Sequence, residues 1–177
     1  NRCKKAKYAL DMLIVCAEDL KDITLYDLAI EKYEKFFKED ENLANIYFSR
    51  ALFHKSREDY QLARKDFCKI EKDFKEFKDP NYMLEVAHFY YKIKDFLKSR
   101  LRFKLFIENY KNHEYVLDAW RYFVNSSIKI IEKVDKDKKN LAKNLLIKDL
   151  KNFLKNTLRE NQFLQENLQK YLKNFIE

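Results

Sequence analysis

The side chains of this chain that could do chemistry are spaced too widely to form a recognisable active site. Its histidines, His54, His88 and His113, are isolated from one another, and none belongs to an HExxH pattern or to a His/Cys cluster with metal-ligand spacing. The pair Ser126 and Ser127 has no nearby base and no glycine elbow. We therefore expect no catalytic residues, no metal and no cofactor. For His54 and His88 we expect inward or groove-lining packing.

Cysteine and glycine usage excludes further classes of site. Cys3, Cys16 and Cys68 have no paired metal spacing, and an odd count argues against a disulfide framework. Cys16 and Cys68 fall on apolar helix faces, so we expect both to be small buried residues. Phosphate-cradling loops and dinucleotide turns need glycine, and the 177 residues contain none. With a single proline as well, the chain favours helix throughout and is expected not to be an enzyme.

Lysine is the residue type whose distribution points to a binding surface. The formal net charge is +8, and residues 129–177 hold twelve Lys or Arg against seven Asp or Glu. Lys148, Lys151 and Lys155 share one face of a predicted helix, opposite Leu146 and Leu150. Such a basic face could be solvated, or could meet an acidic protein, an anionic lipid surface or nucleic acid. Nucleic acid is disfavoured, because Lys dominates over Arg and no reading module is recognised.

The elements that must position these residues are helices. Apolar spacing predicts them over about 6–21, 26–39, 43–57, 60–77, 80–93, 96–110, 114–134, 138–156 and 160–176. Asn42, Asp59 and Asp95 are expected N-caps, and Asp79-Pro80 marks a helix start. These helices are too short to be stable alone, so packing must stabilise them. No apolar run reaches roughly 18 residues, so no transmembrane segment is expected.

Six positions recur along the chain, first 34 and then 36 residues apart. They are Leu13, Tyr47 and Met83; Ala17, Ala51 and Ala87; Tyr26, Tyr60 and Phe96; Ala29, Ala63 and Ser99; Tyr33, Phe67 and Phe103; and Phe36, Ile70 and Phe106. A period in this range predicts stacked helical hairpins, none of which can bury its apolar face alone. We expect three hairpins over residues 1–111. Residues 112–177 are expected to be non-repeating helices packed on that array.

The pattern resembles that of the tetratricopeptide repeat (TPR) family. The second repeat matches best, at Tyr47, Ala51, Tyr60, Ala63 and Phe67. The chain departs from the family pattern in three ways. The glycine of the inter-helix turn is replaced by Thr24, Glu58 and Lys94, and the proline after the second helix is replaced by Glu41, Lys75 and Lys111. The small residue late in the second helix is replaced by Phe36, Ile70 and Phe106. The resemblance implies an all-α, right-handed superhelical array of helix-turn-helix hairpins with C-terminal capping helices.

A narrower resemblance concerns one repeat. The segment 103–110, followed by Glu114-Tyr115 and Asp118-Ala119, is similar to bacterial envelope repeat proteins that assist outer-membrane assembly or partner the Tol–Pal system. This resemblance favours the periplasmic side of the bacterial cell envelope over the cytoplasm. It keeps an envelope-assembly or complex-stabilising factor, peripherally associated with the membrane, as an alternative function.

In such an array the first helix of each hairpin lines a concave groove. Carried over to this chain, the groove residues that would bind a partner are Ile14, Asn45, Phe48, Leu52, Lys55, His88, Tyr91 and Lys92, with Asp11, Glu18 and Leu84 beside them. They would suit an extended or helical peptide, or could instead be buried against the C-terminal helices. The sequence thus predicts a non-enzymatic scaffold that binds another protein through this groove and its C-terminal helices. A nucleic-acid-binding protein using the basic C-terminal third is the second alternative.

Overall fold

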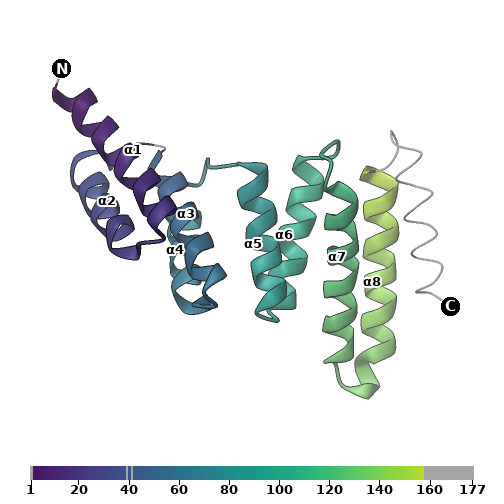
Figure 1. The fold of residues 1–177 in the computed structure, drawn as a ribbon. Coiled ribbons are helices and arrows are strands. Elements are labelled where there is room, and N and C mark those ends of the chain that lie inside the picture. Colours follow the sequence, from purple (N-terminus) through teal and green to yellow (C-terminus); the bar gives the residue numbers. More distant parts are fainter. Residues whose placement is uncertain (1, 39, 41, 158–177) are drawn as a thin grey trace. The chain divides into compact units, whose positions relative to one another are not determined.

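The chain is all-α in the computed structural model, which describes residues 2–38, 40 and 42–157 (Figure 1). These residues form eight helices and no strand: α1 (Arg2–Leu20), α2 (Ile23–Phe36), α3 (Asn42–Ser56), α4 (Tyr60–Asp73), α5 (Pro80–Lys92), α6 (Phe96–Asn109), α7 (Val116–Glu132) and α8 (Lys136–Thr157). The predicted all-α class is confirmed. The helix expected over 160–176 lies outside the described residues. Within the described part, no helix combines the length and apolarity needed to cross a membrane.

The helices divide between two compact units, Asn1–Asp79 with α1 to α4 and Pro80–Glu177 with α5 to α8. In the first unit α1 packs on α2 and α3 packs on α4, with α2 also touching α3. In the second unit each helix packs on the next. The boundary expected at residue 111 falls inside the second unit, between α6 and α7.

Side chains at the recurring positions form the cores of both units. The small residues Ala17, Ala51 and Ala87 are fully buried, as are the aromatic residues at 33, 67 and 103. Phe36 is an exception, since 63% of its surface is exposed. Its environment therefore differs from that of Ile70 and Phe106, which are fully buried. Helix α2 ends at Phe36, and the neighbouring Phe37 contacts Tyr33 instead, with ring centroids 5.6 Å apart.

Each helical hairpin turns on a residue other than glycine with positive φ. Lys21, Glu58 and Lys94 have φ of 53°, 64° and 62°. Glu58 and Lys94 occupy the positions where the family pattern has glycine, but the first turn uses Lys21 and not Thr24. Because 12 residues separate Ala17 from Ala29, as in the other hairpins, this turn lies three residues early, shortening α1 and extending α2.

Acidic residues mark most of the helix starts. The Asp95 carboxylate accepts a hydrogen bond from the Lys98 amide at 3.2 Å, as an N-cap should, and Pro80 begins α5 as predicted. Asp59 precedes α4 but makes no capping hydrogen bond with its side chain. Asn42 was expected to cap α3 and is instead its first residue. Its amide donates to the Asp40 carboxylate at 3.0 Å, so Asp40 supplies that interaction.

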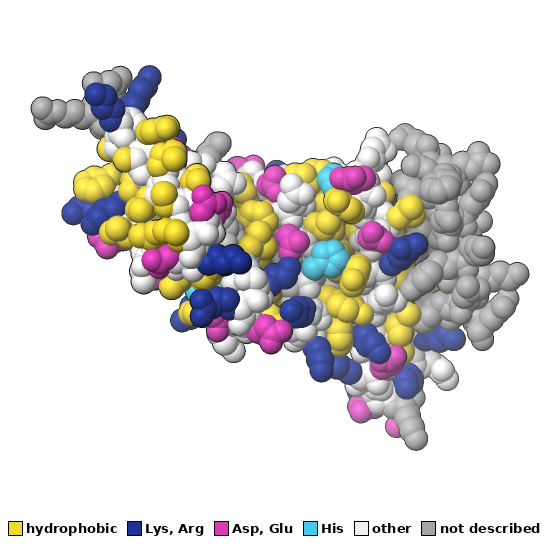
Figure 2. All heavy atoms as spheres, in the orientation of Figure 1, with side chains coloured by type: hydrophobic (Ala, Val, Ile, Leu, Met, Phe, Trp, Pro, Cys, Tyr) yellow, Lys and Arg dark blue, Asp and Glu magenta, His cyan; other side chains and the backbone are white. Residues whose placement is uncertain are grey.

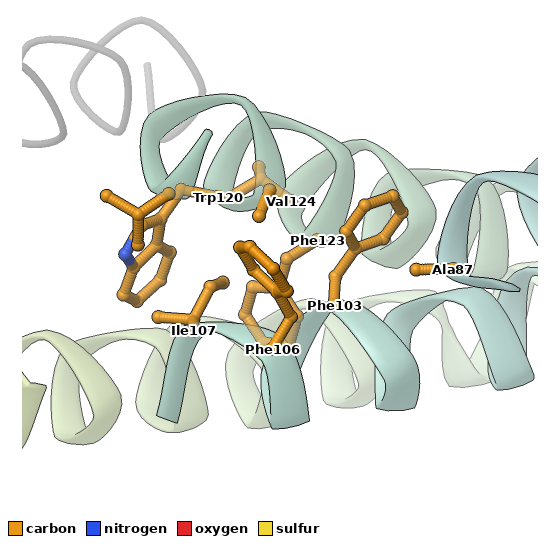
Figure 3. Close-up of a cluster of buried hydrophobic side chains, with 9 residues drawn as sticks. Ala87, Phe103, Phe106, Ile107, Trp120, Phe123 and Val124 are labelled. Atoms are coloured by element: carbon orange, nitrogen blue, oxygen red, sulfur yellow. The ribbon is translucent and has the colours of Figure 1, made fainter. Parts of the chain in front are cut away.

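The core of the second unit runs continuously through α5, α6 and α7. Phe103, Phe106 and Ile107 of α6 face Trp120, Phe123 and Val124 of α7, with Ala87 of α5 at the edge of the cluster (Figure 3). Burying each large apolar side chain contributes about 1.5–3 kcal/mol. Helix α7 is therefore an integral layer of this unit, so the hydrophobic core extends beyond the last recurring residue at position 106.

Candidate partner-binding surfaces

An open hollow in the first unit joins two of the predicted groove helices. It has a volume of about 520 Å³ and is lined by Glu18, Lys21, Tyr26, Ser49, Leu52, Phe53, Ser56 and Arg57. Leu52 and Phe53 are half-buried and lie beside the buried Tyr26, whose ring centroid is 5.9 Å from that of Phe53. Glu18, Lys21 and Arg57 are exposed. The hollow thus combines an apolar floor with charges of both signs.

The remaining groove residues predicted in the first unit lie at its surface to different degrees. Ile14, Phe48 and Lys55 are half-buried, and Asn45 is exposed. A polar network holds α1 against the other helices, because the Asp11 carboxylate accepts from the Asn42 side-chain amide at 2.9 Å and from the Tyr33 hydroxyl. Burial of the Tyr33 hydroxyl is the main reason that the pKa of Tyr33 is raised to about 12, and its hydrogen bond to Asp11 acts in the same direction.

The second unit brings His88 and Tyr91 against a C-terminal helix. The Tyr122 ring of α7 lies 4.5 Å from the His88 ring and 5.0 Å from the Tyr91 ring, between centroids, and it stacks on Phe103 at 5.3 Å. His88 and Tyr91 remain half-buried and Lys92 is exposed. These contacts are the ones expected if the groove residues pack against the C-terminal helices. Both rings nevertheless remain partly exposed at the surface.

A buried ion pair, not anticipated from the sequence, lies in a second hollow of the first unit. Arg50 on α3 makes a bidentate contact with Asp66 on α4, at 2.9 and 2.6 Å, and its third nitrogen contacts Asp27 on α2 at 2.5 Å. Asp66 is only 4% exposed. The partners lie 16 and 23 residues from Arg50 in sequence, so helical periodicity gave no signal for them. The arrangement ties three helices together.

His54 packs inward beside this ion pair, as expected. It is 7% exposed, and its Nδ1 has no hydrogen-bond partner in the described part of the chain. Desolvation lowers the pKa of His54 from its ordinary value of 6.5. His54 is therefore a packed core group beside the ion pair, and the described residues that line this hollow include no serine, threonine or cysteine.

Ser126 and Ser127 are buried and serve the packing of the second unit. Ser126 Oγ lies 3.0 Å from Ser99 Oγ, which donates to the Ala87 carbonyl at 3.2 Å. Ser127 Oγ donates to the Phe123 carbonyl at 2.8 Å. These hydrogen bonds satisfy the hydroxyls inside the core, where an unpaired polar group would be destabilising.

The predicted basic face of α8 is exposed at Lys148, Lys151 and Lys155. The same sector also carries two exposed leucines, Leu141 and Leu145, which were not among the predicted site residues. They stand at helical spacing before Lys148, so their position on this face could have been found from periodicity. The side chains at positions 146 and 150, which were predicted to form the opposite apolar face, are not among those that the structure describes.

A polar contact fastens α8 to α6 and α7. Asp149 of α8 accepts from the Arg100 guanidinium and lies 3.7 Å from the Lys104 ammonium, both on α6. The Arg100 Nε donates to Ser127 Oγ of α7 at 2.8 Å. Arg100 therefore connects three helices of the second unit, as Arg50 does in the first.

The expectation of buried cysteines is wrong, because Cys16 and Cys68 are both exposed. Cys16 lies on the side of α1 that also exposes Met12 and Val15. Hydrophobic side chains gather at the surface around α1 (Figure 2). No described helix covers this side of α1. In the described ranges, no group of three or more His, Cys, Asp or Glu could hold a metal ion.

No protein-family model matches the chain, and no curated protein matches it either. The resemblance to the TPR family is therefore carried by the quoted sequence positions alone and stays a prediction.

Proposed function

We propose that this chain is a non-enzymatic scaffold that binds another protein through the exposed face formed by α1 and α3. The observation that carries the proposal is the hollow beside α1 and α3. Its floor, where Leu52 and Phe53 are half-buried beside the buried Tyr26, offers apolar surface to a partner side chain, and the charged Glu18 and Arg57 stand beside it. Interfaces of this kind derive most of their affinity from a few anchors in such depressions.

The partner best suited to this hollow is an extended or helical peptide segment. Leu52 and Phe53 would receive an apolar anchor, while Glu18 and Arg57, of opposite charge, would set the direction of the peptide. We further propose that the hairpins follow the TPR arrangement, with α7 and α8 at the end of the array. The equivalent burial of Ala17, Ala51 and Ala87 supports this.

Affinity capture from native lysate tests the proposal, with Leu52→Ser compared with Leu28→Ser. Leu28 is an exposed leucine of the same unit and lines none of its described hollows, so it controls for loss of apolar surface. A purified partner should bind Leu52→Ser more weakly by about 30-fold, the loss expected of an anchor residue, and should bind Leu28→Ser normally. Circular dichroism checks that both variants are folded. An identical set of captured proteins and unchanged affinity for Leu52→Ser would refute the groove.

A further inference from the structure

We infer that α6 and α8 together form a second docking surface, which takes an acidic amphipathic helix of a partner protein. The surface consists of Leu97 and Leu101 on α6, Leu141 and Leu145 on α8, and the lysines around them; we refer to it as the α6–α8 face. The inference rests on the proposed role as a protein-binding scaffold. It concerns a different unit from the hollow beside Leu52, so the two can fail separately.

The four leucines are among the most exposed apolar side chains of the described residues. Leu97 and Leu101 are 71% and 55% exposed, and Leu141 and Leu145 are 63% and 59% exposed. Single exposed leucines are ordinary on protein surfaces. Here each helix presents two at i and i+4, so each forms a continuous apolar ridge.

The contact of Asp149 on α8 with Arg100 and Lys104 on α6 shows that the two leucine ridges lie on adjacent sides of α6 and α8. Arg100 and Lys104 follow Leu97 and Leu101 by three residues, and Asp149 follows Leu145 by four, so each charged group lies on the same side as its leucine. Because Arg100 and Lys104 both meet Asp149, the leucine-bearing sides of α6 and α8 flank one ion-pair cluster. A partner helix laid along that cluster would touch both ridges.

Comparison of the repeats indicates that folding does not require the leucines of α6. The positions equivalent to Leu97 are Gln61 and Asp27, and those equivalent to Leu101 are Lys65 and Glu31. Polar side chains therefore serve at these positions in the first unit. Leucine at both positions of α6 adds exposed apolar surface that the helix does not need for its own packing.

Charge identifies the chemistry of the partner. Lys148, Lys151 and Lys155 are exposed on α8, Lys98 is exposed on α6, and the carboxylate of Asp149 is already engaged by Arg100. A complementary partner carries Asp and Glu beside its apolar residues. Two leucine ridges with lysines around them match a helix with leucines at i, i+4 and acidic flanks. A nucleic acid strand would offer the lysines phosphates but would leave the leucines without apolar contacts.

Fluorescence anisotropy with the full chain tests this assignment. The probe is a labelled peptide of about 20 residues, long enough to span the face as a helix, with leucines at i, i+4 and glutamates beside them. A scrambled peptide of equal composition is its control. We expect saturable binding of the first peptide only, weakened as NaCl rises from about 0.15 to 0.5 M.

Two pairs of substitutions locate the binding. The double variant with Leu97→Ser and Leu145→Ser should bind the probe at least about tenfold more weakly, which corresponds to losing roughly 1.4 kcal/mol of apolar contact. The matched control, Leu28→Ser with Leu62→Ser, removes two leucines that are 42% exposed in the first unit and should bind normally. Leu52→Ser should also bind normally. Fluorescence of Trp120 reports whether the second unit stays folded in each variant.

Three outcomes would overturn the inference: no saturable binding of the amphipathic probe, equal binding of the scrambled peptide, or equal weakening by the control pair. Anionic phosphatidylserine vesicles and an oligothymidine strand are assayed in parallel. Leucine-dependent binding to either one, without binding of the peptide, would assign the face to lipid or nucleic acid and reject a protein helix. Each of these results leaves the capture experiment with Leu52→Ser unaffected.

Discussion

At the scale of single residues, the left-handed turn residues are a source of strain. Lys21, Glu58 and Lys94 hold positive φ, where a residue with a Cβ is disfavoured by about 1–2 kcal/mol. Glycine removes that cost, but it also lowers the free energy of unfolding by about 0.5–1 kcal/mol because it gives the unfolded chain more conformational freedom. We predict that Glu58→Gly raises the free energy of unfolding by about 0.5–1 kcal/mol, measured by urea denaturation. Lys65→Gly, within α4, should instead lower it by about 1 kcal/mol, and equal destabilisation by both would contradict the turn geometry.

His54 makes the stability of the first unit depend on pH. Its pKa is lowered by desolvation; Arg50 acts in the same direction, whereas Asp66, Asp59 and Asp27 oppose the shift. As pH falls through 6.5, unfolded His54 takes up a proton that the folded state does not yet bind, so stability decreases until the lower folded pKa is reached.

We therefore predict that His54→Gln reduces the loss of unfolding free energy between about pH 7 and pH 5, measured by urea denaturation. His113→Gln, at a half-buried position in the other unit, is the control, because it leaves the first unit unchanged and that unit should retain its wild-type slope. Glu34 also has a lowered pKa, chiefly because the Tyr47 hydroxyl donates to it. Its contribution is lost only as pH falls below its ordinary 4.5, outside this window. A wild-type slope in His54→Gln would contradict the assignment.

At the scale of elements, the described contacts between α8 and α6 are charged. Asp149→Asn removes the carboxylate that Arg100 and Lys104 share, so we predict a loss of about 1 kcal/mol and faster amide hydrogen exchange across 136–157. Asp118→Asn disrupts the exposed pair with Arg121 on α7 and should change neither quantity measurably. Unchanged protection of α8 in Asp149→Asn would show that other contacts hold this helix.

At the scale of the whole molecule, the division at residue 79 predicts two unfolding transitions. The single Trp120 is buried in the second unit and reports on it alone, whereas circular dichroism follows the helices of both. Ala51→Leu overpacks the contact of α3 with α4, which should cost about 1–3 kcal/mol. We expect it to shift the circular dichroism curve and leave the tryptophan midpoint in place.

Phe123→Ala leaves a cavity in the core of the second unit, which costs about 3–5 kcal/mol, so it should lower the tryptophan midpoint together with the second unit's share of the circular dichroism change. Chemical denaturation followed by both probes on the same samples makes the comparison. If Ala51→Leu also moved the tryptophan midpoint, the chain would unfold as one cooperative body and the division would have no energetic meaning.

Much of the local structure could be predicted from the sequence. Apolar spacing located the eight described helices to within a few residues, Pro80 marked a helix start, and the recurring alanines at 17, 51 and 87 are all buried. These features depend on neighbours within a few residues along one helix, which is the information that periodicity carries. The same information placed Lys148, Lys151 and Lys155 on one exposed face.

Only the tertiary structure decided which helix faces are covered and which distant groups meet. Arg50 with Asp66 and Arg100 with Asp149 join residues 16 and 49 apart, and Cys16 is exposed although its helix face is apolar. Periodicity states which residues share a face, but burial requires a second element to lie against that face. The leucines of the α6–α8 face show this most clearly, because their spacing is that of a core and no described element covers them.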